Sequence, residues 1–309
     1  SCSNVSRAVI IFVVLAIASP TFRTPANLIN VARQVSVNMV IACAMTMVLI
    51  IGGIDLSVGA VMAMAGMVAS YLSLAGLPFG VCLAAGLAAG AVSGVVNGVI
   101  LANTTLPPFI VTYAVQSILR GMVYVITGAG TIRLTSKVFL EFGGGSVGPI
   151  PFPVIYMVVI IALSILLLSR SKLGRHMYAI GGNPKAARFA GINTKRIKIL
   201  IYTLSGVCAA LAGLVLTSRN SSMQPAVGNG AEMDAIAAVV LGGTSMAGGR
   251  GAIAGTILGA FIIGFINNGL NMLKMDSFYQ YICKGVVILI AVYMDYIKNK
   301  KLLKGESAS

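Results

Sequence analysis

Long apolar runs follow one another along the chain, separated by short polar stretches. A run of about twenty residues lets a helix cross the roughly 30 Å of hydrocarbon in a bilayer. We therefore predict an all-α fold with about ten transmembrane helices, two of them short. Their expected positions are 8–19, 37–51, 58–74, 79–101, 109–127, 154–169, 199–218, 235–241 extending to about 246, 252–271 and 279–297.

The composition is that of a membrane protein and excludes several other classes. Hydrophobic residues make up 58% of the 309 residues and charged residues only 9%, with a mean hydropathy of +0.96. Soluble domains carry about 25% charged residues, so this chain has too few to cover a globular surface. A soluble enzyme, a disordered chain and a nucleic-acid-binding domain are therefore excluded. We interpret residues 1–309 as one polytopic transmembrane domain in contact with membrane lipids.

The distribution of basic residues predicts the orientation of the chain. The formal net charge is +15, from 22 Lys and Arg against 7 Asp and Glu. Segment 170–198 and the tail 298–309 are both rich in basic residues, and the first holds no acid. Cytoplasmic loops of membrane proteins carry such an excess, so an even number of spans places both termini in the cytoplasm. The sequence does not begin with Met, from which we expect that a short cytosolic start has been trimmed.

Residues 21–38, between the first two expected spans, contain a helix start. Thr24 fits the N-cap and Pro25 the first helical position. Apolar residues then recur at helical spacing against polar ones, so we expect a short amphipathic helix lying in the outer interface of the membrane. An ordinary polar linker is the alternative.

Glycine recurs at every fourth position along two of the expected spans. Such faces let helix backbones approach closely in lipid, where no hydrophobic effect drives helices together. Tight packing is therefore favoured over a direct functional role. The residues are Gly86, Gly90, Gly94 and Gly98 in one span, and Gly251, Gly255 and Gly259 in the other.

Two glycine pairs, Gly52-Gly53 and Gly242-Gly243, interrupt apolar runs. A broken helix survives at membrane depth only where protein or water satisfies the freed backbone groups. Paired interruptions in the two halves of a membrane protein are typical of a transport pathway. Asp55 follows the first pair and is expected to cap the next helix, because an acid is favoured at a helix N-terminus. An ion or proton relay is the alternative role for Asp55.

Polar side chains inside the spans are costly and are therefore functional candidates. Arg120 and Lys284 are expected to bind freed backbone carbonyls or a carboxylate, with Asp55 as one candidate partner of Arg120. Amides can both donate to and accept from hydroxyl groups, which suits a pathway for a polar molecule. Hydrogen bonding between helices is the alternative. The pathway candidates are Asn38, Asn97, Tyr113, Gln116, Asn267, Asn268 and Asn271.

A short helix is predicted in the basic loop, over 183–191. Asn183 fits its N-cap, Pro184 its first position, and Gly191 the residue that ends it. Isolated helices need about 12–15 residues, so this one is expected to dock against a cytosolic partner or lipid headgroups. The contact candidates are Asn183, Pro184, Lys185, Ala187, Arg188, Ala190 and Gly191.

Neither metal nor disulfide chemistry is indicated by the sequence. The single histidine, His176, has no carboxylate or thiol neighbour along the chain, so no metal site is expected. Four of the five cysteines lie in apolar runs and are interpreted as small buried hydrophobes. The phosphate-cradling motif G-x-x-x-x-G-K-[ST] does not occur, so the chain is not expected to hydrolyse ATP by that route.

The segment from Gly52 to Gly59, GGIDLSVG, resembles the GIDLSVG signature of the monosaccharide permeases of bacterial ABC importers. Residues 181–193 resemble the cytosolic coupling loop of that family, and 234–245 and 267–271 resemble two further stretches. The resemblance covers essentially the whole chain, in order, and is strongest to the ribose-type permeases. Branched-chain amino-acid permeases are more distant relatives that lack the GIDLSVG form.

The resemblance implies a type II ABC importer permease, which is the membrane subunit of an ATP-driven importer in the inner membrane of a bacterial cell. Two copies of the chain, or two similar chains, would enclose a path for a monosaccharide. Ribose is the first choice, and another pentose, a hexose or a furanose-like signalling molecule are the alternatives. A periplasmic sugar-binding protein would deliver the sugar, and a separate cytosolic subunit docked on 183–191 would bind ATP and Mg²⁺. On this interpretation the chain is not an enzyme, carries no cofactor and binds no nucleic acid.

An ion-coupled secondary sugar transporter is the alternative function. It would need a titrating carboxylate within the membrane, and Asp55 is the only plausible one in the sequence. An intramembrane enzyme is a third class, which no Ser/His pair, HExxH motif or close carboxylate pair supports.

Overall fold

The structure, a computed structural model, describes residues 24–272 together with 282, 285, 286, 289 and 293. The expected span 8–19, most of 279–297, Lys284 and the tail 298–309 lie outside the described residues. The helices are α2 (Pro25–Ile50), α3 (Val58–Leu74), α4 (Phe79–Asn103), α5 (Pro108–Thr127), α6 (Lys137–Gly144), α7 (Phe152–Arg170), α8 (Lys172–Gly182), α9 (Pro184–Phe189), α10 (Thr194–Arg219), α11 (Ala231–Leu241) and α12 (Ile253–Met272). The strands are β1 (Ile132–Arg133), β2 (Ser146–Val147), β3 (Ile150–Pro151) and β4 (Ser222–Met223).

A helix is present at every expected span within the described residues. Six helices, α2, α4, α5, α7, α10 and α12, are long and apolar enough to cross a membrane. The apolar helix α3 has 17 residues. α11 has 11 residues and lies where one of the two short spans is predicted. The prediction of a mainly helical, multi-span protein is therefore confirmed.

The prediction of a separate interfacial helix over 21–38 is wrong. Thr24 does cap a helix, since its hydroxyl accepts from the N–H of Asn27, but that helix is α2 and continues without interruption to Ile50. Neither glycine nor a further proline interrupts the sequence of α2, so nothing ends the helix before the membrane span begins. The buried side chain of Asn27 pairs with Asn268 of α12, which accounts for a polar residue that the sequence pattern assigned to an interface.

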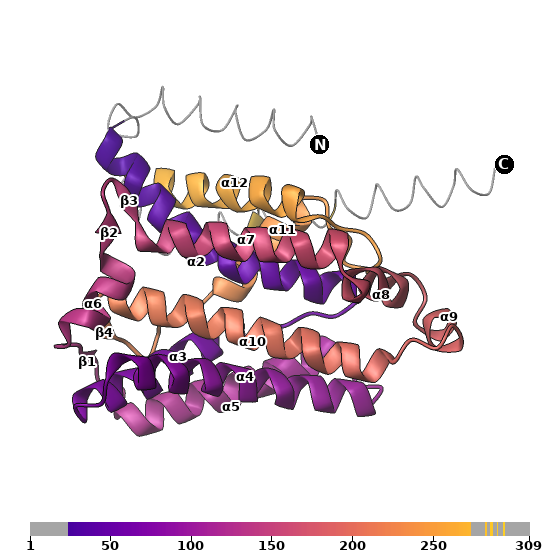
Figure 1. Cartoon of the computed structure of the whole chain (residues 1–309), viewed down its shortest axis with the longest axis horizontal. Coiled ribbons are helices and arrows are strands. Elements are labelled where there is room, and N and C mark those ends of the chain that lie inside the picture. Colours follow the sequence, from indigo (N-terminus) through magenta and orange to yellow (C-terminus); the bar gives the residue numbers. More distant parts are fainter. Residues whose placement is uncertain (1–23, 273–281, 283–284, 287–288, 290–292, 294–309) are drawn as a thin grey trace.

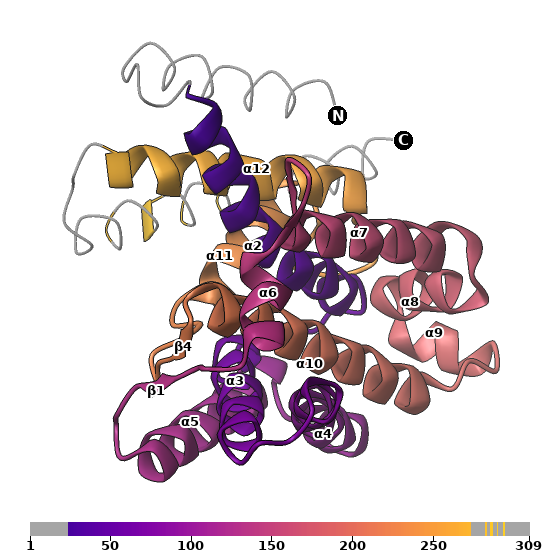
Figure 2. The same cartoon turned by 60° about the vertical axis from the view of Figure 1, so that its left-hand side comes forward.

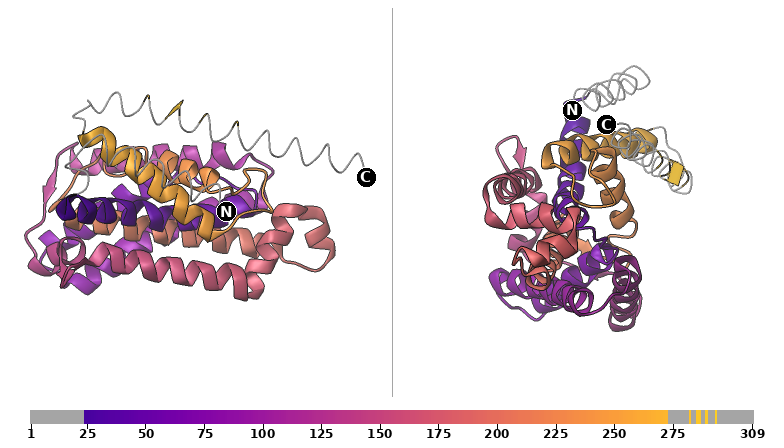
Figure 3. Two further views of the ribbon diagram at one scale, coloured as in Figure 1. Left: turned by 90° about the horizontal axis from the view of Figure 1, so that it is seen from above. Right: turned by 90° about the vertical axis from the view of Figure 1, so that its right-hand side faces the viewer.

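The long helices lie side by side along the long axis of the molecule, with α8 and α9 at one end and α6 with the strands at the other (Figure 1). We call these the α9 end and the strand end. α2 runs through the middle and contacts α7, α10, α11 and α12 (Figure 2). α10 packs against α4 and α3, while α5 lies against α3 at the edge. At the α9 end, α8 and α9 extend beyond the long helices (Figure 3).

The glycine faces predicted from their spacing are packing surfaces. Gly90 of α4 lies so close to Gly206 of α10 that a Cβ on either residue would collide with the backbone carbonyl of the other. Gly255 of α12 meets Gly242, at the end of α11, in the same way. These contacts leave no room for any side chain, which confirms the structural interpretation.

The strand end is fixed by short elements that the sequence pattern did not predict. β1 pairs with β4, placing Ile132 opposite Met223, and β2 forms a hairpin with β3. The Ser218 hydroxyl of α10 accepts from the N–H of Gly143 at 2.6 Å and donates to the carbonyl of Phe139, which ties α6 to α10. Elements of two to eight residues are too short to leave a hydrophobic period, so they escaped prediction.

Gly90 and Gly121 provide a matched test of backbone packing. Gly90→Leu should lower the thermal unfolding temperature of the purified protein, at a cost beyond the about 1–3 kcal/mol typical of overpacking, because backbone rather than a flexible side chain is in the way. Gly121→Leu on α5 should change stability by no more than about 0.5 kcal/mol, since no atom lies within 4 Å of its would-be Cβ. Equal unfolding temperatures for the two variants would contradict the packing interpretation.

Candidate functional site

Both helix breaks predicted from the glycine pairs are present. Residues 51–57 separate α2 from α3, and residues 242–252 separate α11 from α12. Gly52 and Gly243 have φ angles of +75° and +94°, a region that glycine adopts without strain. The glycine pairs therefore supply the turns that reverse or redirect the backbone at each break.

The two breaks meet at a single backbone junction at the α9 end. The N–H of Gly249 in the second break donates to the carbonyl of Ile50, at the end of α2, at 2.9 Å. Gly181 of α8 closes the junction, since a Cβ there would collide with both the Ile50 carbonyl and the Gly249 nitrogen. Sequence reasoning found the breaks but missed this contact, because Gly181 lies in the basic segment 170–198 rather than in a span.

Two side chains from other helices hold the first break. The Tyr202 hydroxyl of α10 donates to the freed carbonyl of Ile54 at 3.3 Å, and a Cβ on Gly53 would come within 2.5 Å of that hydroxyl oxygen. Thr112 of α5 accepts from the N–H of Leu56 at 3.1 Å. The break thus contacts α5 and α10 directly. Nothing local in the sequence singles out Tyr202 or Thr112, since their partners lie more than fifty residues away.

Asp55 is 1% exposed and accepts three hydrogen bonds. One carboxylate oxygen accepts from the N–H of Ser57 at 3.0 Å and from its hydroxyl at 2.6 Å, and the other accepts from the Ser205 hydroxyl at 2.7 Å. Asn97 of α4 donates to the Ser57 hydroxyl at 2.8 Å. The prediction that Asp55 caps α3 is wrong, since the N-cap is Ser57; Asp55 lies two residues before that cap and links the start of the helix to α10.

Arg120 binds freed carbonyls, as predicted, but not Asp55. Its guanidinium donates to the carbonyls of Pro225 and Val227, at 2.6 and 2.8 Å. The predicted pairing of Arg120 with Asp55 is wrong, because serine groups surround that carboxylate instead. Arg120 therefore fastens the loop between β4 and α11 onto α5.

The predicted pathway residues separate into three groups. Asn38 and Asn267 line one pocket. Asn97 and Asn268 are buried and hydrogen-bonded within the chain, Asn97 to Ser57 and Asn268 to Asn27. The remaining three lie toward the surface: Tyr113 and Gln116 on α5 and Asn271 at the end of α12, of which Tyr113 is 59% exposed.

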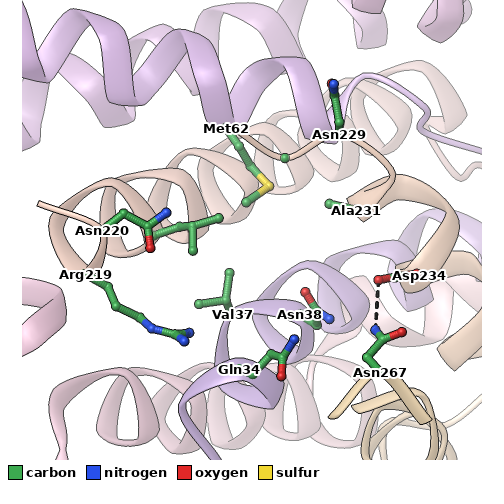
Figure 4. Close-up of a pocket in the computed structure, with 12 residues that line it drawn as sticks. Gln34, Val37, Asn38, Met62, Arg219, Asn220, Asn229, Ala231, Asp234 and Asn267 are labelled. Atoms are coloured by element: carbon green, nitrogen blue, oxygen red, sulfur yellow. Dashed lines mark hydrogen bonds between the residues drawn. The ribbon is translucent and has the colours of Figure 1, made fainter. Parts of the chain in front are cut away.

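The pocket has a volume of about 270 Å³ and lies toward the strand end, where α2 and α3 face the ends of α10, α11 and α12 (Figure 4). Asn267 donates to the Asp234 carboxylate at 3.2 Å. In Figure 4, Arg219 lies toward one side of the pocket and Asp234 with Asn267 toward the other. The pocket is lined by Gln34, Val37, Asn38, Met62, Leu216, Arg219, Asn220, Gly228, Asn229, Ala231, Asp234 and Asn267. We call it the amide pocket.

Sequence reasoning found only two members of the amide pocket. Gln34 was assigned to an interfacial helix, and Arg219 and Asp234 stand at the ends of apolar runs, where charges are ordinary. The sequence did contain one signal for this pocket, namely Asp234, an acidic residue directly before a short apolar span. No cluster of three or more His, Cys, Asp or Glu side chains that could hold a metal occurs among the described residues.

The short loop helix is present and capped as predicted. The Asn183 side chain accepts from the N–H groups of Lys185 and Ala186, both at 3.0 Å, and Gly191 ends α9 with a φ of +80°. Ala187 is 4% exposed and faces into the protein, whereas Phe189 is 93% exposed. Any surface that α9 offers to a partner is therefore centred on Phe189.

A second cavity, of about 550 Å³, lies between α9 and the loop that joins α4 to α5. Its charged lining residues are Arg188, Lys195 and Lys198, and no acidic residue lines it. Gly52 and Gly181 also line it, so the cavity reaches from α9 to the backbone junction of the two breaks.

Variants of Asp55 test whether its hydrogen-bond acceptors or its negative charge hold the first break together. Asp55→Asn should unfold close to the wild-type temperature, because the amide can accept from Ser57 and donate to the Ser205 hydroxyl. Asp55→Leu should unfold at a clearly lower temperature, since each buried donor left unpaired costs about 1–3 kcal/mol. Ser205→Ala, which removes one bond, should fall between them. If Asp55→Asn were as unstable as Asp55→Leu, the charge rather than the acceptor capacity would hold the break.

Comparison with known proteins identifies the family. A family model described as branched-chain amino acid transport system / permease component matches residues 27–292. The ribose import permease protein of Bacillus subtilis is 47% identical over 292 residues, covering 94% of this chain and 91% of that protein. The ribose import permease protein of Escherichia coli is 45% identical over 298 residues, covering 94% and 91%. The D-allose transport system permease protein of Escherichia coli is 38% identical over 294 residues, covering 95% and 90%.

No solved structure matches the chain. The relatives are sugar permeases by name, although the family description names branched-chain amino acids. Permease components are the membrane-spanning subunits of transport systems and are not enzymes, in agreement with the resemblance found in the sequence. The chain therefore belongs to the branched-chain amino acid transport system / permease component family and is a multi-pass membrane transport subunit.

Proposed function

We propose that the chain is the permease subunit of an ATP-driven importer that moves a monosaccharide, in the first instance ribose, into the cytoplasm. The ribose import permeases are 42–47% identical to it over nearly the whole length of both chains, and the allose permease follows at 38%. The structural observation that carries the proposal is α9, a capped helix that presents a single exposed aromatic side chain at the basic end of the molecule.

The proposed orientation places the α9 end in the cytoplasm of a bacterial cell and the strand end outside its inner membrane. Eight described helices coincide with expected spans, and the apolar runs 8–19 and 279–297 would bring the total to ten. An even number of spans puts both termini in the cytoplasm, on the side of the basic segment 170–198. A sugar-binding protein would then approach the strand end.

α9 is the proposed docking element for a cytosolic ATP-binding subunit. Helices that recognise a partner groove do so through side chains exposed on one face. Phe189 is such a side chain, and the flanking Lys185 and Arg188 are also exposed. ATP and Mg²⁺ would be bound by that subunit, since this chain lacks the phosphate-cradling motif.

A second copy of the chain is the proposed partner of α5. This helix is largely exposed, yet it carries Tyr113, Gln116 and Ser117 on its surface. An amide and hydroxyls are unfavourable against lipid hydrocarbon, whereas a water-filled path or another protein surface can satisfy them. Two copies facing each other through α5 would enclose such a path.

The alternative, an ion-coupled transporter, depends on Asp55. Its carboxylate is buried, has serine donors on both oxygens and links three helices near the first break. This environment favours a structural role over a relay, which would need access to water on both sides of the membrane.

Energy coupling distinguishes the two transport classes. Ribose uptake into vesicles should require this chain, the ATP-binding subunit, the sugar-binding protein and hydrolysable ATP with Mg²⁺. Proton and sodium ionophores should not reduce the initial rate, because no ion gradient drives the step. A non-hydrolysable ATP analogue serves as the control. Accumulation by this chain alone that an ionophore abolishes would overturn the importer assignment.

Phe189 tests the docking element. Phe189→Glu should abolish co-purification of the ATP-binding subunit and the stimulation of its ATPase activity, while thermal unfolding of the permease stays unchanged because the side chain contacts little else. Val138→Glu, on the exposed surface of α6 at the opposite end, is the matched control and should leave co-purification intact. Ala187→Glu is less informative, since Ala187 is buried and its replacement disturbs α9 itself.

Normal co-purification with Phe189→Glu would move the docking element to another cytosolic segment. The first candidate would then be 245–251, which lies next to Gly181 of α8 through Gly248 and Gly249.

A further inference from the structure

We infer that the amide pocket binds one neutral monosaccharide inside a single copy of the chain, separately from any path between two copies. The choice of a sugar rests on the proposed function, whereas the existence and chemistry of the pocket do not.

The polar groups of the pocket match a polyhydroxylated ligand. Five amide side chains line it, from α2, from α12 and from the segment between α10 and α11, and each amide offers both a donor and an acceptor to hydroxyl groups. A sugar ring carries hydroxyls around its edge, and each of these also donates and accepts. The amides are Gln34, Asn38, Asn220, Asn229 and Asn267.

Asn267 contains an acceptor that nothing in the described part of the chain fills. The residue is 4% exposed, its amide nitrogen donates to Asp234, and its carbonyl oxygen has no hydrogen-bond partner. A buried acceptor left without a donor costs about 1–3 kcal/mol. Because this oxygen is enclosed, a ligand hydroxyl would reach it once the Asn267 side chain turns toward the pocket that it lines.

The charges of the pocket favour a neutral ligand. Among the described residues that line it, Arg219 and Asp234 are the charged ones, one of each sign, and they lie toward different sides of the cavity (Figure 4). A carboxylate can accept from two neighbouring hydroxyls and a guanidinium can donate to a further oxygen. The phosphate of a phosphorylated sugar would be attracted by Arg219 and repelled by Asp234, so the lining offers it no net gain for the water that it would lose.

The size and the lining set the ligand class and its affinity. A volume of about 270 Å³ lies just below the roughly 300–1,000 Å³ of pockets for drug-sized ligands, which suits one sugar ring better than a disaccharide. None of the lining residues is aromatic, and Val37, Met62 and Leu216 supply the apolar surface. Without an aromatic face to stack on, binding should be weak and quickly reversible, as transport requires.

The position of the pocket connects it to the second break. Asp234 and Asn267 belong to α11 and α12, the two helices that flank residues 242–252. These helices are packed against each other through Gly242 and Gly255, and the break between them touches α8 at Gly181. A ligand held between Asp234, Asn267 and α2 therefore contacts the same helix pair that reaches the α9 end.

Equilibrium dialysis of the purified full-length permease in lipid nanodiscs, with radiolabelled D-ribose and no partner protein, tests the inference. Saturable binding is expected, with sucrose and ribose 5-phosphate failing to compete. Asn267→Leu and Asn38→Leu should each weaken ribose binding by about tenfold, the loss of roughly one hydrogen bond with its desolvation. Asn268→Leu is the matched control, because Asn268 is the same residue type on the same helix but pairs with Asn27 outside the pocket lining.

A second measurement covers variants that fold poorly. Asn38→Cys, compared with wild type, should react with a small charged thiol reagent, and ribose should slow that reaction whereas sucrose should not. Absence of saturable ribose binding together with absence of protection at Asn38→Cys would overturn the inference. So would unchanged affinity in the Asn38 and Asn267 variants, or competition by sucrose.

The uptake and binding experiments together distinguish a wrong assignment of the pocket from a wrong proposed function. If ATP-driven uptake by the complete transporter is normal while the permease binds no ribose, the importer function stands and only the pocket assignment is overturned. If uptake does not depend on ATP, the proposed function fails, and saturable binding lost in Asn267→Leu would still support the pocket as a sugar site.

Discussion

Helices in a membrane gain little from pressing apolar side chains together, because lipid is as apolar as leucine. Direct backbone contact has to supply part of the association, and in this chain α4 and α10 make it through Gly90 and Gly206. The contact fixes the rotation and height of α10 beside the first break. Tyr202 and Ser205, on the same stretch of α10, are thereby placed where they bond Ile54 and Asp55. Without the glycine contact, neither residue would reach the freed groups of the break.

The same constraint governs the junction of the two breaks. Interrupting a helix frees N–H and C=O groups that lipid cannot satisfy, so the broken segments must find partners in each other. The hydrogen bond from Gly249 to Ile50 is one such partnership, and Gly181 of α8 packs onto it without a side chain between. Because no flexible side chain separates these backbones, a displacement of α8 must move both breaks rather than being absorbed locally. α9 follows α8 directly, so its position and the geometry of the breaks are linked by covalent and backbone contacts alone.

The predictions that succeeded depended on neighbours in sequence. The caps of α9 at Asn183 and Gly191 and the glycine face containing Gly90 are local patterns, and each has one structural solution. The failures involved distant partners. Asn27 pairs with Asn268 across more than two hundred residues, and the same polar spacing would suit a helix lying in an interface. The residues that line the amide pocket come from five helices and from the loops beside two of them, so no single segment of the sequence predicts the pocket. The partners of Asp55 and Arg120 were likewise set by packing rather than by spacing.

Polar side chains within the spans differ in whether their hydrogen bonds are closed within the chain. Asn268 with Asn27, and Asp55 with its serine partners, are closed, and exchanging such a bond with a passing ligand would leave a buried group unpaired at about 1–3 kcal/mol. Residues that act on a ligand are therefore expected where a bond is still open. Among the predicted pathway residues that the structure describes, two buried carbonyl oxygens meet this condition, that of Asn267 in the amide pocket and that of Asn97 beside the first break. The helices bearing them reach the two breaks separately, α4 through the hydrogen bond from Asn97 to Ser57 and α12 through its own start, so both open acceptors lie on helices that are tied to one backbone junction.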